Sequence, residues 1–337
     1  MQRTRTAFNS LLILLLLTLT VTVAAQKPSK AKVQRNSAKL PAVIWRGAES
    51  VGSLNLLYGA GGQEHAPDAN GSYTFISESS SGHSPKFDVK DAQGVVWKVK
   101  MGEESHSEIA ATRLLWAAGY FVDEDYYLPT LKVMGMPKLH RDSELVSAGG
   151  TVRKVRLERH LKGVKKLRNW DWFNNPFVNK RELNGLRVMM ALLNNWDLQA
   201  YNNSVYQVGG ERRFVVNDVG ATFGKTGNNF VRSKSVLKDY ANSRFVDKVT
   251  PKYINFVMES RPFAASIVNV SNYKTRTRME DITENIPRAD ARWLGQILAQ
   301  LSPEQIRDCF RAGGFTPEEV EGYATAVQKR IAELNKL

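Results

Sequence analysis

The feature that most limits the folds open to this chain is the order of its local patterns, with strand signals first and helix signals later. Residues 73–76, 86–89 and 95–100 alternate apolar and polar side chains, and Gly-bearing turns separate them. Such runs predict an antiparallel meander. After residue 162 the apolar positions recur at helical spacing, most clearly over 181–194. Segregated strands and helices indicate an α+β protein rather than an alternating α/β one.

Helix starts support this division. Ser105-His106-Ser107-Glu108 fits a capping box directly after the third strand. Near the end of the chain, Ser302 and Thr316 are each followed by a proline and then by acidic residues, as at helix N-termini. We therefore expect a two-lobed molecule, with a small antiparallel-sheet N-lobe over 73–160 and a larger helical C-lobe over 161–337.

The N-terminus has the pattern of an export signal. Arg3 and Arg5 precede an apolar run over 11–23, which ends in the small residues Ala24 and Ala25. The run is shorter than the ~20 residues of a membrane-spanning helix. We expect residues 1–25 to be a cleaved signal peptide, 26–72 a basic flexible leader and linker, and the mature chain to be periplasmic or extracellular with no transmembrane span. The alternative is an uncleaved membrane anchor.

The chemistry is concentrated in one stretch after the 181–194 helix. Asp197 lies in the loop that follows, Asn202 comes five residues later, a hairpin is expected over 204–216, and Asp218-Val219-Gly220 follows it. Phosphoryl transfer needs a carboxylate to orient the acceptor hydroxyl, and an Asn and a second Asp to hold the metal on the phosphates. Asp197, Asn202 and Asp218 match these needs, and Gly220 allows a sharp turn.

This order resembles the protein-kinase-like superfamily in its atypical branches, the HipA, phosphatidylinositol-kinase and secretory-pathway kinases, as an exported bacterial-type member. The resemblance implies a two-lobed kinase-like fold. It implies that Lys100 binds the nucleotide phosphates, that Glu108 holds Lys100, and that Gly82 lies in the turn covering the phosphates. The chain departs from the pattern at Asn195-Trp196, where His-Arg is usual, and in having one glycine in that turn.

Plainer structural roles stay open for each of these residues. Asp197 alone could cap a turn, and Glu108 could be the acid at the third position of the capping box. Lys98 and Lys100 could both line the solvent face of a strand. We favour Lys100 for the site because the chain turns at Gly102 and places that lysine at the end of the strand.

The expected function is an exported atypical kinase-like phosphotransferase that uses ATP with Mg²⁺ or Mn²⁺. Its acceptor hydroxyl could belong to a protein, a glycan or a lipid headgroup, and AMP transfer is a related possibility. The alternative is a catalytically degraded kinase fold that serves as an interaction platform. The five histidines show no zinc-ligand spacing, and no nucleic-acid-binding motif is present.

Charge adds a candidate docking surface. The chain has 47 Lys and Arg against 33 Asp and Glu, a formal net charge of +14. Residues 151–169 hold eight of the basic residues and one acid, Glu158. A cluster of this kind between the two lobes predicts binding of an acidic substrate or an anionic headgroup.

Overall fold

A computed structural model of the chain describes residues 38–48, 50–79, 85–141, 143–227, 232–258 and 279–337. The chain divides into two compact units, Met1–Lys39 and Leu40–Leu337, and the account below concerns the second. The expected signal segment 1–25 and Gly82 lie outside the described residues.

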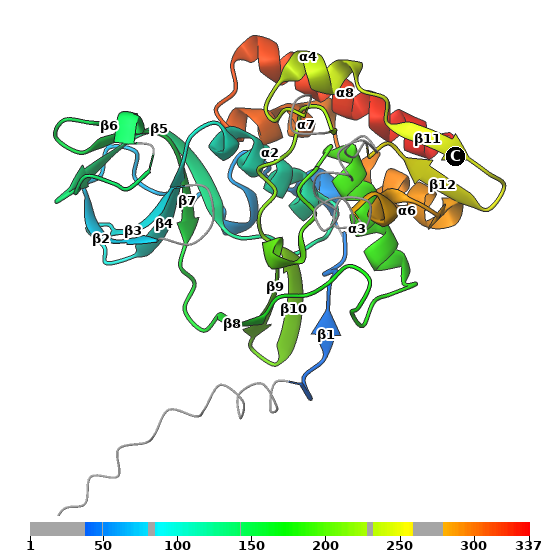
Figure 1. Ribbon diagram of the computed structural model, residues 1–337, viewed down its shortest axis with the longest axis horizontal. Coiled ribbons are helices and arrows are strands. Elements are labelled where there is room, and N and C mark those ends of the chain that lie inside the picture. The colour runs from blue at the N-terminus through cyan, green and yellow to red at the C-terminus, as the bar shows by residue number, and fades with distance from the viewer. Residues whose placement is uncertain (1–37, 49, 80–84, 142, 228–231, 259–278) are drawn as a thin grey trace, which may run out of the picture. The chain divides into compact units, whose positions relative to one another are not determined.

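The strand-rich part is a six-stranded sheet that closes on itself. Its order is β4-β3-β2-β5-β7-β6, and an additional β4–β7 pairing joins five of these strands into a ring (Figure 1). The meander expected over the first three strands is present, since β2–β3 and β3–β4 are antiparallel. The sheet is not wholly antiparallel, however, because closing the ring brings β5 beside β2 in the same direction. Closure leaves β4 without a free edge. The strands are β2 (Tyr73–Ser79), β3 (Lys86–Lys90), β4 (Val96–Met101), β5 (Asp125–Met134), β6 (Val146–Ser147) and β7 (Thr151–Arg159).

Side chains alternate between the inside and the outside of this barrel, as the pleat requires. Trp97 and Val99 of β4 and Leu157 of β7 belong to the buried cluster that fills the interior. The residues between them, Lys98, Lys100 and Arg156, therefore point outward. One outer face of the barrel thus carries charged groups in place of an apolar surface.

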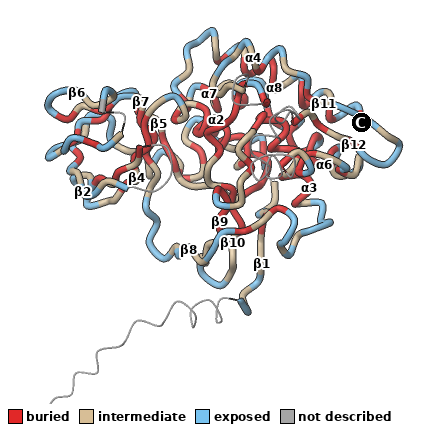
Figure 2. The backbone as a smooth tube through the Cα atoms, in the orientation of Figure 1, coloured by how far each residue is buried: buried red, intermediate tan, exposed pale blue. Residues whose placement is uncertain are grey.

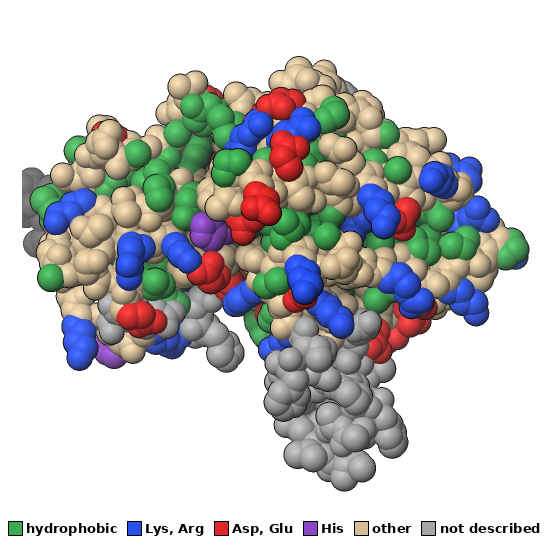
Figure 3. Space-filling view, turned by 90° about the horizontal axis from the view of Figure 1, so that it is seen from above, with side chains coloured by type: hydrophobic (Ala, Val, Ile, Leu, Met, Phe, Trp, Pro, Cys, Tyr) green, Lys and Arg blue, Asp and Glu red, His purple; other side chains and the backbone are tan. Residues whose placement is uncertain are grey.

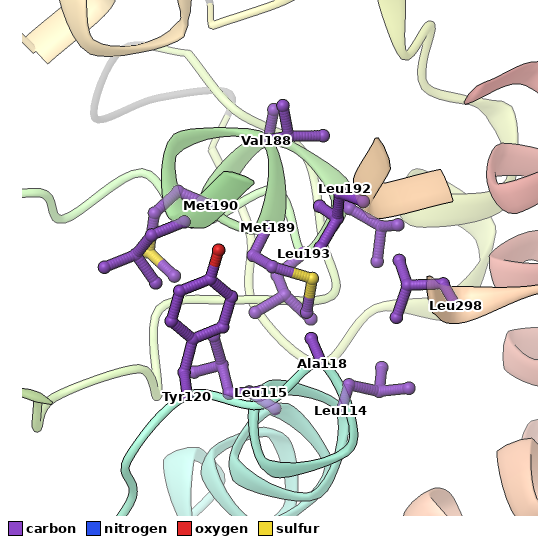
Figure 4. Packing of buried hydrophobic residues seen from close by; sticks show 14 of the residues in the cluster. Leu114, Leu115, Ala118, Tyr120, Val188, Met189, Met190, Leu192, Leu193 and Leu298 are labelled. Atoms are coloured by element: carbon purple, nitrogen blue, oxygen red, sulfur yellow. The ribbon is translucent and has the colours of Figure 1, made fainter. Parts of the chain in front are cut away.

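Helix α2 (Glu104–Ala117) covers that outer face. It packs against β5 and β7 on one side and against α7 (Pro303–Ala312) on the other, so it is buried nearly all round, as expected for a helix between two layers. Figure 4 shows Leu114 and Leu115 facing Met189 and Leu193, which come from α3 (Arg181–Leu192) and the residue after it. The capping-box expectation for α2 is wrong. The helix begins one residue before Ser105, whose hydroxyl donates to the Lys100 carbonyl instead.

The remaining helices and two small sheets form the second part of this unit. The helices expected after Ser302 and Thr316 are present with both capping boxes formed, and the expected hairpin joins β9 to β10. Figure 2 shows the buried residues concentrated along α3 and the helices around it. The helices are α4 (Leu237–Asn242), α6 (Arg288–Leu298) and α8 (Pro317–Asn335). The sheets run β1 (Ala42–Val43), β10 (Glu211–Val216), β9 (Asn203–Val208), β8 (Lys165–Arg168), and β11 (Val246–Val249), β12 (Tyr253–Phe256), β13 (Ile286–Pro287).

Part of the segment expected to be a flexible leader is folded. β1 pairs in parallel with β10, and Ile44, Val51 and Leu56 are buried in the core of the helical part. The Gln305 amide donates to the carbonyls of Val51 and Leu54. These apolar residues are too widely spaced to form a helix or strand pattern of their own, and they are ordered by the surface they cover.

Mixed α+β architecture is thus present. None of the helices in the described part of the chain has both the length and the apolar character needed to cross a membrane.

Candidate functional site

Lys100 is the centre of the candidate site. Its ammonium group lies 2.8 Å from Glu108 Oε2, 2.9 Å from Glu104 Oε2 and 3.2 Å from Asp218 Oδ1. The two glutamates come from successive turns of α2, which begins directly after the turn at Gly102 (φ 100°). The aspartate comes from 118 positions further along the chain. Three of the sequence-predicted site residues, Lys100, Glu108 and Asp218, are therefore brought into direct contact.

Burial and charge determine the state of these groups. Lys100 and Glu108 each expose 2% of their side chains. Burial alone lowers the pKa of Lys100, but the three carboxylates around it outweigh burial and hold that pKa above its usual value. Burial raises the pKa of Glu108, and the neighbouring Arg156 and Lys100 offset this only in part. Asp218 behaves oppositely, since Lys100 and Lys86 overcome the effect of burial and lower its pKa.

The loop that carries Asp218 is fixed to α2. The Ser107 hydroxyl donates to the Gly220 carbonyl at 2.7 Å. A Cβ at Gly220 would lie 3.1 Å from Glu104 Cβ and 3.3 Å from Lys100 Nζ. Gly220 is not in the left-handed region, so the sharp-turn role expected for it is wrong. A side chain there would press on Glu104 and on the ammonium group of Lys100.

The loop from Asn194 to Asn202 is held by its own side chains. The Asn195 side chain accepts from the Asp197 amide at 3.0 Å, and Asn202 Nδ2 donates to the Asp197 carbonyl at 3.0 Å. The Asn202 carbonyl in turn accepts from the Asn217 amide at 2.9 Å and from the Asp218 amide at 3.4 Å. The structure therefore joins Asp197, Asn202 and Asp218 through the backbone of two adjacent loops.

Arg330 of α8 supports this loop from below. The guanidinium, 3% exposed, donates to the Leu192 carbonyl, to Asn194 Oδ1 and to Ser243 Oγ at 2.8, 2.8 and 2.7 Å. Asn194 has a φ of 53° and ends the helix before the loop. A buried cation thus neutralises the C-terminal carbonyls of α3 where the candidate catalytic loop begins.

A divalent cation fits the residues present. Asn202 uses its Nδ2 in the loop, so its Oδ1 is the atom suited to a metal, and Asp218 exposes 34% of its side chain. One amide oxygen and one carboxylate are hard ligands, and Mg²⁺ is commonly held by one or two such groups together with substrate phosphates. No cluster of three or more His, Cys, Asp or Glu suited to a metal occurs among the described residues.

Two site residues could not be found from the sequence. Glu104 was expected to precede the helix, and its position four residues after Lys100 indicates contact only once α2 is known to start there. Arg156 pairs with Lys100 in the register of β4 and β7 and lies 3.7 Å from Glu108. Only the strand register reveals that Arg156 is buried beside the site.

The basic segment 151–169 does not act as one surface. Lys154 pairs with Glu103, Arg153 donates to the Glu144 carbonyl, and Arg156 is buried. Besides Arg153, the exposed basic residues of the segment are Lys162, Lys165, Lys166 and Arg168. Figure 3 shows basic and acidic side chains interspersed on the face it presents, rather than one basic field.

No protein-family model matches the chain, and no curated protein sequence does. Among solved structures, it is similar to the crystal structure of a Helicobacter pylori proinflammatory kinase, CtkA, with a TM-score of 0.46 and 11% identity over 79% of this chain and 96% of that one. It is also similar to the Golgi casein kinase, with a TM-score of 0.33 and 10% identity over 91% of this chain and 78% of that one. At these scores the likeness decides nothing about this chain's own chemistry.

Proposed function

We propose that the protein is a kinase-like phosphotransferase that binds ATP and a divalent metal in the space between its sheet part and its helical part, which act as two lobes. The observation that carries the proposal is the buried contact of Lys100 with both Glu108 and Asp218. A buried lysine in a structural ion pair needs one carboxylate, whereas this one has three within 3.2 Å. Such a surplus of negative charge is suited to a cation and to the phosphates that accompany it.

Each residue then has a definite task. Lys100 binds phosphate oxygens, and Glu108 keeps its ammonium group in position. Asn202 and Asp218 hold Mg²⁺ or Mn²⁺, which when bound offsets the negative charge of the phosphates. Because α2 and the Asp218 loop are joined through Ser107, these groups are positioned before the nucleotide arrives, which lowers the cost of binding.

Asp197 serves the acceptor. Its carboxylate orients the acceptor hydroxyl and takes its proton as the oxygen bonds to the γ-phosphorus and the bond from that phosphorus to the β–γ bridging oxygen breaks, releasing ADP. The acceptor is a hydroxyl of a protein, a glycan or a lipid headgroup. An anionic acceptor is favoured by the exposed lysines and arginine over 162–168, which follow the end of β7 in the chain.

Export of the protein is part of the proposal and rests on the pattern of residues 1–25. Its test is the N-terminal mass of the protein recovered outside the cytoplasm, which should begin near residue 26. A protein that keeps residues 1–25 and sediments with membranes would instead be anchored.

The central test measures stabilisation of the full chain by ATP with and without Mn²⁺, using thermal unfolding. We expect stabilisation only with both present, and its loss in Asp218→Asn. Asp247→Asn is the matched control, since Asp247 is exposed and pairs with the exposed Arg244. If ATP with metal does not stabilise the wild-type protein, the nucleotide site is absent and the chain acts as a kinase-fold binding module.

A further inference from the structure

A nucleotide bound at Lys100 can extend in only one direction along β4. Beyond Met101 the chain turns at Gly102 and enters α2, so that end of the strand is covered. In the other direction Lys98 points to the same outer face and lies about 7 Å from Lys100, two strand residues away. The sugar and base of a nucleotide whose phosphates contact Lys100 must therefore lie toward Lys98.

The groups at that position are polar. Lys98 Nζ lies 2.8 Å from Glu158 Oε1, and Glu158 Oε2 accepts from Arg156 at 3.1 Å. Beside them, Asp123 Oδ2 accepts from Asn217 Nδ2 at 2.9 Å. We call Lys98, Glu158, Asp123 and Asn217 the base cluster. Asn217 directly precedes Asp218, so the base cluster is continuous with the proposed metal site.

The base cluster is open to a ligand. Lys98, Glu158 and Asp123 expose 40%, 15% and 19% of their side chains. Its hydrogen bonding is also incomplete. Asn217 Oδ1 and Arg156 Nη2 are buried without a hydrogen-bond partner, and Arg156 Nη2 lies 4.0 Å from Asp123. Buried polar groups are normally paired, and these two atoms leave part of the hydrogen-bonding capacity beside the base cluster unused.

An apolar slot would bind any flat base by stacking. This cluster instead offers one donor, Lys98, and two carboxyl groups whose oxygens can accept, Glu158 and Asp123. Guanine presents the complementary edge: the acceptor O6, then the donors N1–H and N2–H₂. Adenine has one amino donor on that edge, next to the acceptor N1, which would face a carboxylate oxygen.

We propose that the base cluster recognises guanine, so that the site binds GTP at least as tightly as ATP. The inference rests on the proposed function, because it places the phosphates at Lys100. Lys98 contacts O6, and Glu158 and Asp123 accept from N1–H and N2–H₂. Sites that hydrogen-bond a ligand group reject analogues that lack it, since their own polar groups are then left unpaired.

The experiment measures the Kd of GTP, ATP and ITP by calorimetry on the full chain with Mn²⁺. ITP keeps O6 and N1–H but lacks the N2 amino group. We expect GTP to bind at least as tightly as ATP, and ITP about tenfold more weakly than GTP, the effect of one lost contact of ~1.4 kcal/mol. Glu158→Gln should weaken GTP by about tenfold or more and change the Kd of ATP far less.

Lys98→Met is an independent test of the same contact. The Lys98 side chain is more exposed than that of Glu158, so its removal should leave the fold intact. It should also weaken GTP, whereas Lys90→Met, at an exposed position of the adjacent strand β3, should change nothing. Tighter binding of ATP than GTP by about tenfold, or equal effects of both variants on the two nucleotides, would overturn the guanine assignment and leave the proposed function standing. If no nucleotide binds with metal present, both the guanine assignment and the proposed function are overturned.

Discussion

Replacing Glu108 by Gln tests whether the buried charges are as interdependent as their geometry indicates. Glu108 lies between two buried cations, with Lys100 at 2.8 Å and Arg156 at 3.7 Å. Glutamine has almost the same shape, so the change removes a negative charge without making a cavity. The amide nitrogen also brings a donor toward cations that have only donors to offer.

The size of the effect follows from these distances. At an effective dielectric constant of about 20, the attractions of Glu108 to Lys100 and to Arg156 are roughly 6 and 4–5 kcal/mol. Much of this is offset because a neutral Gln no longer carries the cost of burying a carboxylate. Lys100 also retains Glu104 and Asp218. We expect a net loss of about 2–4 kcal/mol in the free energy of unfolding, below the top of the range for a broken buried pair.

The assay is urea unfolding at pH 7, followed by tryptophan fluorescence, together with the Kd of ATP–Mn²⁺. Glu321→Gln is the matched control, because Glu321 Oε1 lies 2.7 Å from Arg307 Nε but is 58% exposed. Exposed pairs contribute ~1 kcal/mol or less. The reasoning is refuted if Glu108→Gln is no more destabilising than Glu321→Gln and binds ATP–Mn²⁺ as the wild-type protein does. In that case the pair neither stabilises the fold nor positions Lys100.

Three further changes probe other parts of the site. Burial, reinforced by Glu158, raises the pKa of Asp123 to about 7 from an ordinary value of 3.8. The folded protein therefore favours protonated Asp123, and the stability that this preference contributes is fully present below pH 4 and is lost as pH rises through 7. Asp123→Asn should therefore gain about 1–3 kcal/mol over the wild-type protein between pH 5 and pH 8 in paired urea titrations, and a constant difference would contradict the assigned burial. Arg330→Met should cost about 2–4 kcal/mol because it leaves buried acceptors at the end of α3 unpaired, measured by thermal unfolding; an unchanged Tm would show that water replaces the guanidinium. Gly220→Ala should weaken ATP–Mn²⁺ binding by about tenfold with little loss of stability, since its Cβ would press on Glu104 and Lys100; unchanged affinity would mean that the loop shifts freely.

Much of the site could be predicted from local sequence. Lys100 was chosen because the strand ends at Gly102, and the structure places it in contact with Glu108 and Asp218. The loop, hairpin and second loop that carry Asn202 and Asp218 follow from short-range signals, namely a helix stop and a Gly-Gly turn. Such features are set within about ten residues of chain, where backbone preference and side-chain pattern act directly.

Which charged residues surround the site could not be predicted from the sequence, and the reason is physical. Whether a charge is buried depends on which segment covers it, and the covering segments here are distant in sequence. Lys98 and Lys100 follow the same strand pattern, yet the first is 40% exposed and the second 2%, because α2 covers only one. Arg156 has basic neighbours in sequence that suggested a surface patch, but its pairing with Lys100 puts it on the outer face of the barrel, which α2 covers.

The sequence by itself therefore determined the α+β class, the meander and the capping boxes at Ser302 and Thr316, and it supplied the residues proposed for phosphoryl transfer. Only the tertiary structure decided that the sheet closes into a barrel, that residues 42–56 fold onto the helical part, and that Glu104 joins the lysine. Local signals arise from neighbouring residues, whereas ring closure, burial and the pairing of charges depend on contacts between segments that the chain brings together only when it folds.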